Sequence, residues 1–319
     1  MEPVSSPATG PVAAMGTAFQ WWRSAAEISP RVIADEAARG FTVALIGPPE
    51  ARSRLRESLL EGCVGEAALR EAGVHLREFD AAPGEDLSKA ISFRLWAPES
   101  GASIGGRDHR SFPFSGDRDA VVRDMLRLRP DLAIALARRF PIFRGEACRV
   151  LVRSACVANA QIALLSALPG VLPITAPFLP AAAIADAVVL TKNQAMLVMR
   201  IAAAYGHRPG YTRQVRELLA TVASALGWRT LAREAVSVVP AGVGAAVKGA
   251  IAWSGTYAVG RAAIAYQERG SRPAPVEIRA WETEGRKGAL EAVESLDGGT
   301  AKPHEPDTAG ANDDSPPAI

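Results

Sequence analysis

The residues that could do chemistry gather around Gly47, which follows the apolar run 41–46. A phosphate-binding loop at this point would read G-x-x-x-x-G-K-[ST]. The glycines let backbone N–H groups close on phosphates, the lysine neutralises the charge and the hydroxyl holds magnesium. Where the second glycine, the lysine and the hydroxyl should stand, the chain has Arg52, Ser53 and Arg54. Two prolines after Gly47 also remove backbone donors. The sequence predicts a degenerate phosphate loop that does not hydrolyse nucleotide, although Arg52 or Arg54 could still meet an anion as a charge.

A possible second remnant follows the next strand-like run, where Asp80 precedes Gly84 by one residue more than the D-x-x-G of GTPases. In those enzymes the aspartate reaches magnesium through water. Asp-Ala-Ala-Pro-Gly is also an ordinary turn, so both interpretations stay open. The guanine-reading N-K-x-D is missing, because the similar stretch 191–194 lies in a helical pattern and ends in glutamine.

Other chemistries find no support in the sequence. The four histidines have no metal-ligand spacing among themselves or with the three cysteines, which we interpret as reduced packing residues in a cytoplasm-facing protein. A formal net charge of +2 gives no global field for nucleic acid. We therefore expect no catalytic residue, no metal, no cofactor and no nucleic-acid partner, and a protein that is not an enzyme.

The elements that would carry these residues form an α/β region followed by a helical one. Short apolar or alternating runs at 41–46, 74–79 and 91–96 indicate strands, and 98–118 reads as a loop. Beyond 118 the pattern predicts helices at 118–128, 131–140, 144–168, 180–206, 211–226, 229–239 and 241–269, with a short one at 276–296. The predicted fold is mostly helical, with a small degenerate P-loop-like α/β domain before a larger apolar α-helical domain. The predicted parts are 1–15, disordered; 16–117, the α/β domain with a leading helix; 118–270, the helical domain; and 271–319, a mostly disordered acidic tail.

The helical region is unusually apolar. Thirty-two residues without a charged side chain run from Ser154 to Ala185, more than the roughly 20 needed to cross a bilayer. Four prolines in the middle argue against one straight span. Basic residues flank both ends, which favours keeping both on the cytoplasmic side, so we expect a hairpin that dips into or crosses the membrane twice. A hairpin buried in a soluble helical domain is the alternative.

Polar residues recur on one stripe of the predicted helix 180–206. Asp186, Asn193 and Arg200 are spaced by seven residues and so share a face. We expect this stripe to hydrogen-bond to a neighbouring helix through Asn159 or Gln161, as a structural interhelical network rather than a transport or catalytic site.

The stretches 159–169, 173, 185–194 and 241–257 resemble a bacterial domain of unknown function found beside or fused to GTPase domains and in YcjF-like inner-membrane proteins. The resemblance covers about 118–270. It implies association with a membrane and with GTPase-type domains, and it brings no catalytic residue.

Together these observations favour a membrane-associated, non-enzymatic scaffold or regulatory protein with a pseudo-GTPase domain. It would lie at the cytoplasmic membrane with its soluble parts facing the cytoplasm. Its expected partners are membrane lipid and a GTPase or another membrane protein. An atypical GTP- or ATP-binding or hydrolysing protein and a soluble helical adaptor are the alternatives.

Overall fold

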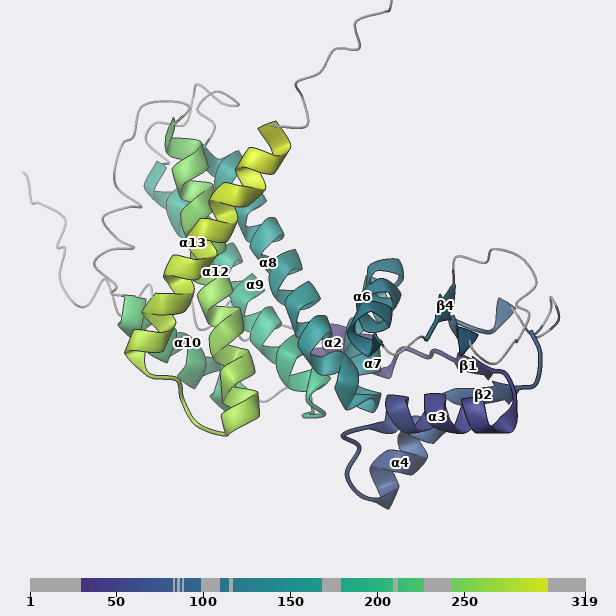
Figure 1. Ribbon diagram of the computed structural model, residues 1–319. Coiled ribbons are helices and arrows are strands. Elements are labelled where there is room, and N and C mark those ends of the chain that lie inside the picture. The colour runs from purple at the N-terminus through teal and green to yellow at the C-terminus, as the bar shows by residue number, and fades with distance from the viewer. Residues whose placement is uncertain are drawn as a thin grey trace, which may run out of the picture.

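The chain forms a small sheet beside a larger bundle of helices in the computed structural model (Figure 1). The structure describes residues 30–82, 84, 87, 89–98, 110–114, 117–167, 179–208, 212–226 and 243–297. At some helix ends it describes the backbone alone, namely at 166–167, 179–188, 212–214, 226, 243–246 and 291–297. The leading residues 1–29 and the predicted helix 229–239 lie outside this description.

The sheet contains four parallel strands in the order β2-β1-β3-β4. Their bounds are β1 Val43–Ile46, β2 Leu76–Phe79, β3 Phe93–Trp96 and β4 Ser111–Pro113. All four residues of β1 are buried, as expected for a central parallel strand whose two faces are both covered. The register aligns Val43 with Leu76 on one side and with Phe93 on the other.

Three of these strands match the predicted runs, and β4 corrects the sequence interpretation. It lies inside 98–118, which the sequence pattern predicts to be a loop. Only three residues long and ending in Pro113, it pairs with β3 alone. A strand this short shows no alternation that sequence could reveal.

Helices α3 (Pro49–Leu60) and α4 (Glu66–Gly73) connect β1 to β2. The apolar side of α3 is built from Ala51, Leu55 and Leu59, which are at most 2% exposed. Two of them, Leu55 and Leu59, join the core cluster formed by one face of the sheet. The apolar face of α3 therefore determines which side of the helix packs against the sheet.

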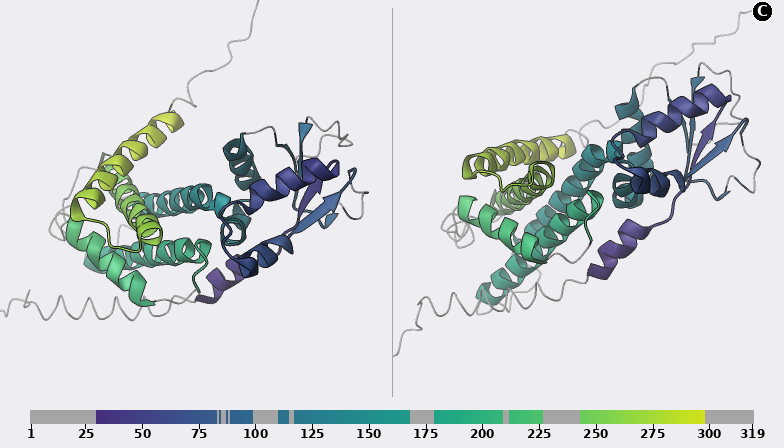
Figure 2. Two further views of the ribbon diagram at one scale, coloured as in Figure 1. Left: turned by 60° about the horizontal axis from the view of Figure 1, so that its bottom comes forward. Right: turned by 90° about the horizontal axis from the view of Figure 1, so that it is seen from below.

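The helical part follows the predicted segments closely. Its elements are α6 Arg118–Leu128, η2 Pro130–Leu132, α7 Ala133–Arg139, η3 Pro141–Phe143, α8 Arg144–Ala167, α9 Leu179–Ala204, α10 Thr212–Leu226, α12 Val243–Arg269 and α13 Pro275–Asp297. Helix α12 packs against α8, α9 and α13, and α8 packs against α9 (Figure 2). The mixed α/β-plus-helical layout and the mostly helical content are thus confirmed.

Two elements pack across the predicted domain boundaries. Helix α2 (Pro30–Ala38) was assigned to the α/β domain, yet it packs against α7 and α9 of the helical part. Helix α13, which occupies the predicted position 276–296, packs against α10 and α12, so the bundle continues past residue 270. Both helices carry apolar residues that need a covering partner: Ile33 on α2 and Ile278 on α13 are fully buried.

The two parts share one apolar core. Phe41, just before β1, stacks on His75 at 4.2 Å between ring centroids and meets Phe140 edge-on at 5.9 Å. Phe140 in turn contacts Phe143, which precedes α8. The same cluster of buried side chains extends from the sheet to Ile278 on α13.

Candidate functional site

The connection between β1 and α3 is very short. Helix α3 begins at Pro49, so only Gly47 and Pro48 separate it from the strand. Gly47 adopts a φ of 136°, which favours glycine, and its N–H donates to the Phe79 carbonyl at 3.0 Å. A phosphate-binding loop needs a longer run of backbone N–H groups around the anion. The described geometry offers a tight strand-to-helix turn instead.

Arg52 lies over this turn and is engaged by protein groups. Its Nη1 donates to the Gly47 carbonyl at 2.7 Å and to the Asp80 carboxylate, and its Nε lies 3.5 Å from Glu78 Oε2. The hydrogen bond to Asp80 and the nearby negative charges raise the pKa of Arg52, against the opposing effect of burial. Its charge is therefore matched by Asp80 and Glu78 at the carboxyl end of β2.

The remaining loop candidates point elsewhere. Ser53 Oγ donates to Glu57 Oε1 at 3.3 Å along the surface of α3, and Arg54 is exposed on the same helix. Asp80, 88% exposed at its side chain, pairs with Arg52, and Gly84 is exposed. The structure thus brings Arg52 and Asp80 together as an ion pair and keeps Ser53 and Arg54 on the surface of the helix.

A buried polar junction joins three helices of the bundle. Asn159 on α8, fully buried, accepts a hydrogen bond from Asn193 Nδ2 of α9 at 2.8 Å. Its own Nδ2 donates to Thr256 Oγ1 of α12 at 2.8 Å and to the Leu190 carbonyl at 3.4 Å. Gln194 Nε2 also donates to Thr256 Oγ1, at 3.4 Å. The junction is therefore built from Asn159, Asn193, Gln194 and Thr256.

The polar side chains of the junction form hydrogen bonds with one another and with nearby backbone carbonyls. Thr256 Oγ1 accepts from two amides and donates to the Ala252 carbonyl at 2.7 Å, and both N–H groups of the Asn159 amide have acceptors. Satisfied buried polar groups fix the register of packed helices, because any slip would leave them unpaired. This arrangement fits a structural role.

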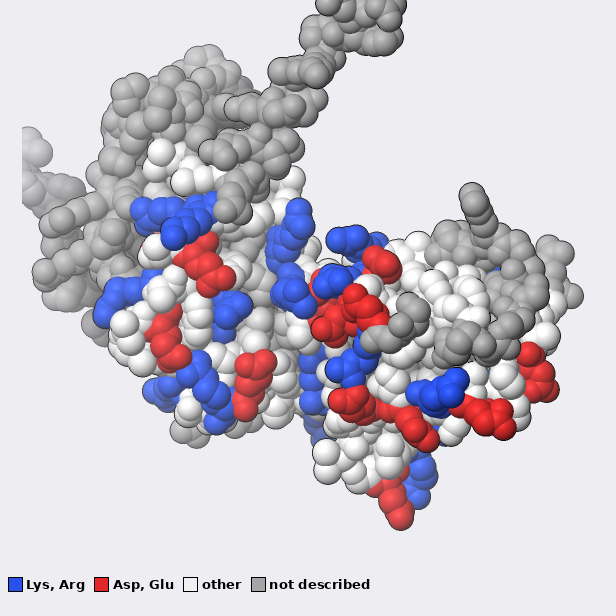
Figure 3. Space-filling model, in the orientation of Figure 1, with Lys and Arg blue, Asp and Glu red and all other residues white. Residues whose placement is uncertain are grey.

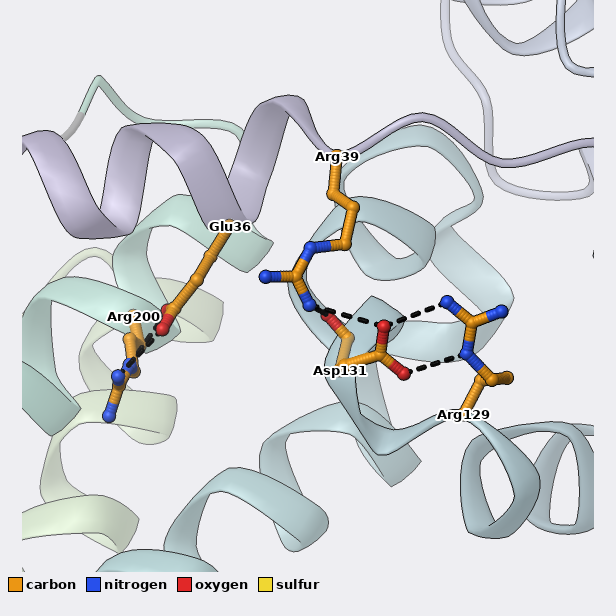
Figure 4. A network of polar contacts seen from close by, with 5 residues as sticks. All are labelled: Glu36, Arg39, Arg129, Asp131 and Arg200. Carbon is orange, nitrogen blue, oxygen red and sulfur yellow. Dashed lines mark hydrogen bonds and ion pairs between the residues drawn. The ribbon is translucent and has the colours of Figure 1, made fainter.

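Arg200 belongs to a separate contact (Figure 4). It makes a two-pronged ion pair with Glu36 of α2, at 2.8 Å from Nε to Oε2 and 2.7 Å from Nη2 to Oε1. Farther along, Arg39 and Arg129 converge on Asp131, at 3.1 Å for Arg39 and 2.8 Å for Arg129. The hydrogen bond from Arg129 is the main cause that lowers the pKa of Asp131. These pairs hold α2 on the helical part.

Of the two remaining predicted network residues, Gln161 does not join the junction, and the side chain of Asp186 lies outside the described residues. Gln161 lies on the exposed side of α8, beside a shallow hollow of about 460 Å³ that is also lined by Val150, Arg153, Ser154, Val157 and Ala158. Asp186 lies on α9 where only the backbone is described. The sequence pattern predicted the contact between Asn193 and Asn159. Glu36, which pairs with Arg200, and Thr256, which pairs with Asn159, were missed because single polar residues on other helices carry no periodic signal.

One described stretch, which includes most of α8, has the length and composition of a membrane span. The stretch Pro141–Leu165 is long and apolar enough to cross a membrane by length and composition, and only 28% of its most apolar part is buried within the fold. Around it, on the face drawn in Figure 3, basic and acidic side chains are interspersed. Among the described residues, no group of histidine, cysteine and acidic side chains could hold a metal ion.

Comparisons with known proteins give no assignment. No protein-family model, no curated protein and no solved structure matches this chain. The resemblance of 118–270 to the GTPase-associated bacterial family stays a prediction.

Proposed function

We propose that this protein is a membrane-associated, non-enzymatic scaffold or regulatory protein at the cytoplasmic membrane. The observation that carries the proposal is the stretch Pro141–Leu165, which is long and apolar enough to cross a membrane and has 28% of its most apolar part buried. Val157, Leu164 and Leu165 on this stretch are exposed. Exposed aliphatic side chains cost hydrophobic free energy in water, and a lipid surface would recover that energy.

The α/β part supports the non-enzymatic side of this proposal. Its strand-to-helix turn is too short to surround a polyphosphate, and Arg52, the nearest cation, is already paired with Asp80. A nucleotide would have to displace that ion pair, and the site would still lack the side-chain hydroxyl that holds magnesium. In the proposed role this pseudo-GTPase part presents a surface to a protein partner, for which a GTPase or another membrane protein is the expected class.

Fractionation of cells that express the full chain tests the membrane association. We expect the protein in the high-speed pellet, released by detergent and retained after a high-salt wash. Recovery in the supernatant without detergent would support the soluble adaptor instead.

Nucleotide titration tests the enzymatic alternative. With GTP and ATP, each with magnesium, we expect no saturable binding up to millimolar concentration. Saturable binding that Arg52→Ala weakens would establish the atypical nucleotide-binding protein in place of the pseudo-GTPase.

A further inference from the structure

Exposed aliphatic side chains gather at one end of the bundle. Leu165 is 70% exposed, Val247 46%, Val189 42% and Leu164 38%. They come from the last turns of α8, the middle of α9 and the first turns of α12. We call these four residues the apolar end.

Contacts between the helices place Val247 level with Leu164 and Leu165, and Val189 about one turn farther back along α8. A Cβ added to Gly249, two residues after Val247, would lie 3.1 Å from the Leu164 side chain. On the other side of α8, Asn159 reaches the carbonyl of Leu190, the residue after Val189. Helices α9 and α12 therefore run antiparallel to α8, and their aliphatic residues meet the end of α8.

Charged residues lie close to the apolar end and limit how deeply it could enter a bilayer. Lys192 lies three residues after Val189, and Lys248 adjoins Val247. No ion pair joins either lysine to a described carboxylate, so their long stems can carry the ammonium groups to water. The sequence also has acidic residues nearby along these helices, with Asp186 three residues before Val189 and Glu291 and Glu294 late in α13. Such a surface suits the boundary of a bilayer and not its interior.

The first half of α8 cannot leave the bundle to span a membrane without exposing its core. Ala147 and Cys148 are fully buried, and Val152 is 4% exposed. Farther along, Asn159 would lose the junction with α9 and α12. A crossing α8 would leave these partners without apolar cover or hydrogen bonds.

From these observations we infer that the apolar end inserts into one leaflet of a bilayer, at the boundary between headgroups and acyl chains, while the sheet stays in water on the same side. Interfacial insertion of this kind buries apolar side chains about 5–10 Å deep and leaves lysines in the headgroup layer. The inference rests on the membrane association proposed above, and it names the surface that performs it.

Vesicle binding by the purified full chain tests the surface. The variant with Leu165→Asp and Val247→Asp is expected to lose at least about tenfold in partitioning to phosphatidylcholine vesicles, because two exposed aliphatic groups no longer enter the lipid. The matched control carries Val32→Asp and Val276→Asp, which are 49% and 65% exposed on α2 and in the first turn of α13. It should bind as the unmodified chain does. Equal binding by the two variants would overturn the inference and leave the proposed function standing, whereas an unmodified chain that binds no vesicle would overturn both.

Labelled cysteines test the depth, in a Cys63→Ser background that keeps the buried Cys148 and Cys156. An environment-sensitive dye on Leu165→Cys should shift to shorter wavelength with vesicles, and the same dye on Val276→Cys should not. Arg153→Cys should stay reactive toward a membrane-impermeant maleimide. A shielded Arg153→Cys would mean that α8 crosses the bilayer, and an unshifted dye at position 165 would mean that this end stays in water; either result overturns interfacial insertion.

Discussion

Arg200 on α9 and Glu36 on α2 lie across from each other with two parallel hydrogen bonds, of 2.8 and 2.7 Å. Both side chains are about two-thirds or more shielded from solvent, at 34% and 22% exposure. The planar guanidinium and the carboxylate match in shape, so the pair orients α2 as well as attracting it. This contact joins residues that lie 164 positions apart in the sequence, and it ties α2, which leads directly toward β1, to the bundle.

Glu36→Gln should lower the free energy of unfolding by about 1 kcal/mol, because it removes a two-pronged pair that is partly shielded. A double-mutant cycle with Arg200→Gln measures the coupling by urea denaturation. The exposed pair Arg127–Asp124, at 3.6 Å, is the control and should show almost no coupling. Equal coupling in the two cycles would contradict the orienting role of Glu36.

Asn159→Ala should lower the free energy of unfolding by about 3 kcal/mol, because the fully buried amide would lose its hydrogen bonds with Asn193, Thr256 and the Leu190 carbonyl. Thr256→Ser keeps the hydroxyl and should cost clearly less than Thr256→Val. Thermal denaturation of the three variants ranks them. If Thr256→Val were as stable as Thr256→Ser, the hydrogen bonds of the junction would contribute nothing.

Gly260→Ala should destabilise the protein by about 1–3 kcal/mol, because the added Cβ would lie 2.5 Å from Cγ2 of Val152 on α8. Gly255→Ala on the same helix is the matched control, since its Cβ would meet nothing within 4 Å. There the gain in helix propensity should stabilise by about 0.5–1 kcal/mol. Chemical denaturation of both variants checks the opposite signs.

Alkaline pH should weaken the fold through two buried thiols. Burial raises the pKa of Cys148 and of Cys156 from 9.0 to about 12. Above pH 9 the unfolded chain therefore loses protons that the folded chain keeps, and stability falls as pH rises from 9 toward 12. Replacing both cysteines by alanine should flatten this decline, as measured by denaturation at pH 8 and pH 11. An unchanged slope would assign the decline to other groups.

The helices of this fold were predictable from the sequence because single residues that stop helices mark where they end. The predicted 118–128 matches α6, and 241–269 matches α12 within two residues at each end. Strand β4 was not predictable, because three residues ending in Pro113 carry no periodic pattern.

The candidate site was predictable only in part. The missing glycine and lysine around Arg52 were visible in the sequence, but the shortness of the turn depends on α3 beginning at Pro49. Likewise, the spacing of Asn193 and Arg200 placed them on one stripe, while the separation of their partners onto α8 and α2 depends on how three helices cross. Packing between distant segments decides such partners, and a single sequence does not encode it in any local pattern.

The contact of Phe41 with Phe140 has a thermodynamic consequence for the whole chain. Because apolar packing is continuous from the strands to α13, heating should disrupt the two parts in one calorimetric transition. A fragment cut between them would expose aromatic surface on both pieces and aggregate. The sheet is thus joined to the helices through packed aromatic side chains, so we expect a tilt of the bundle to carry the sheet with it.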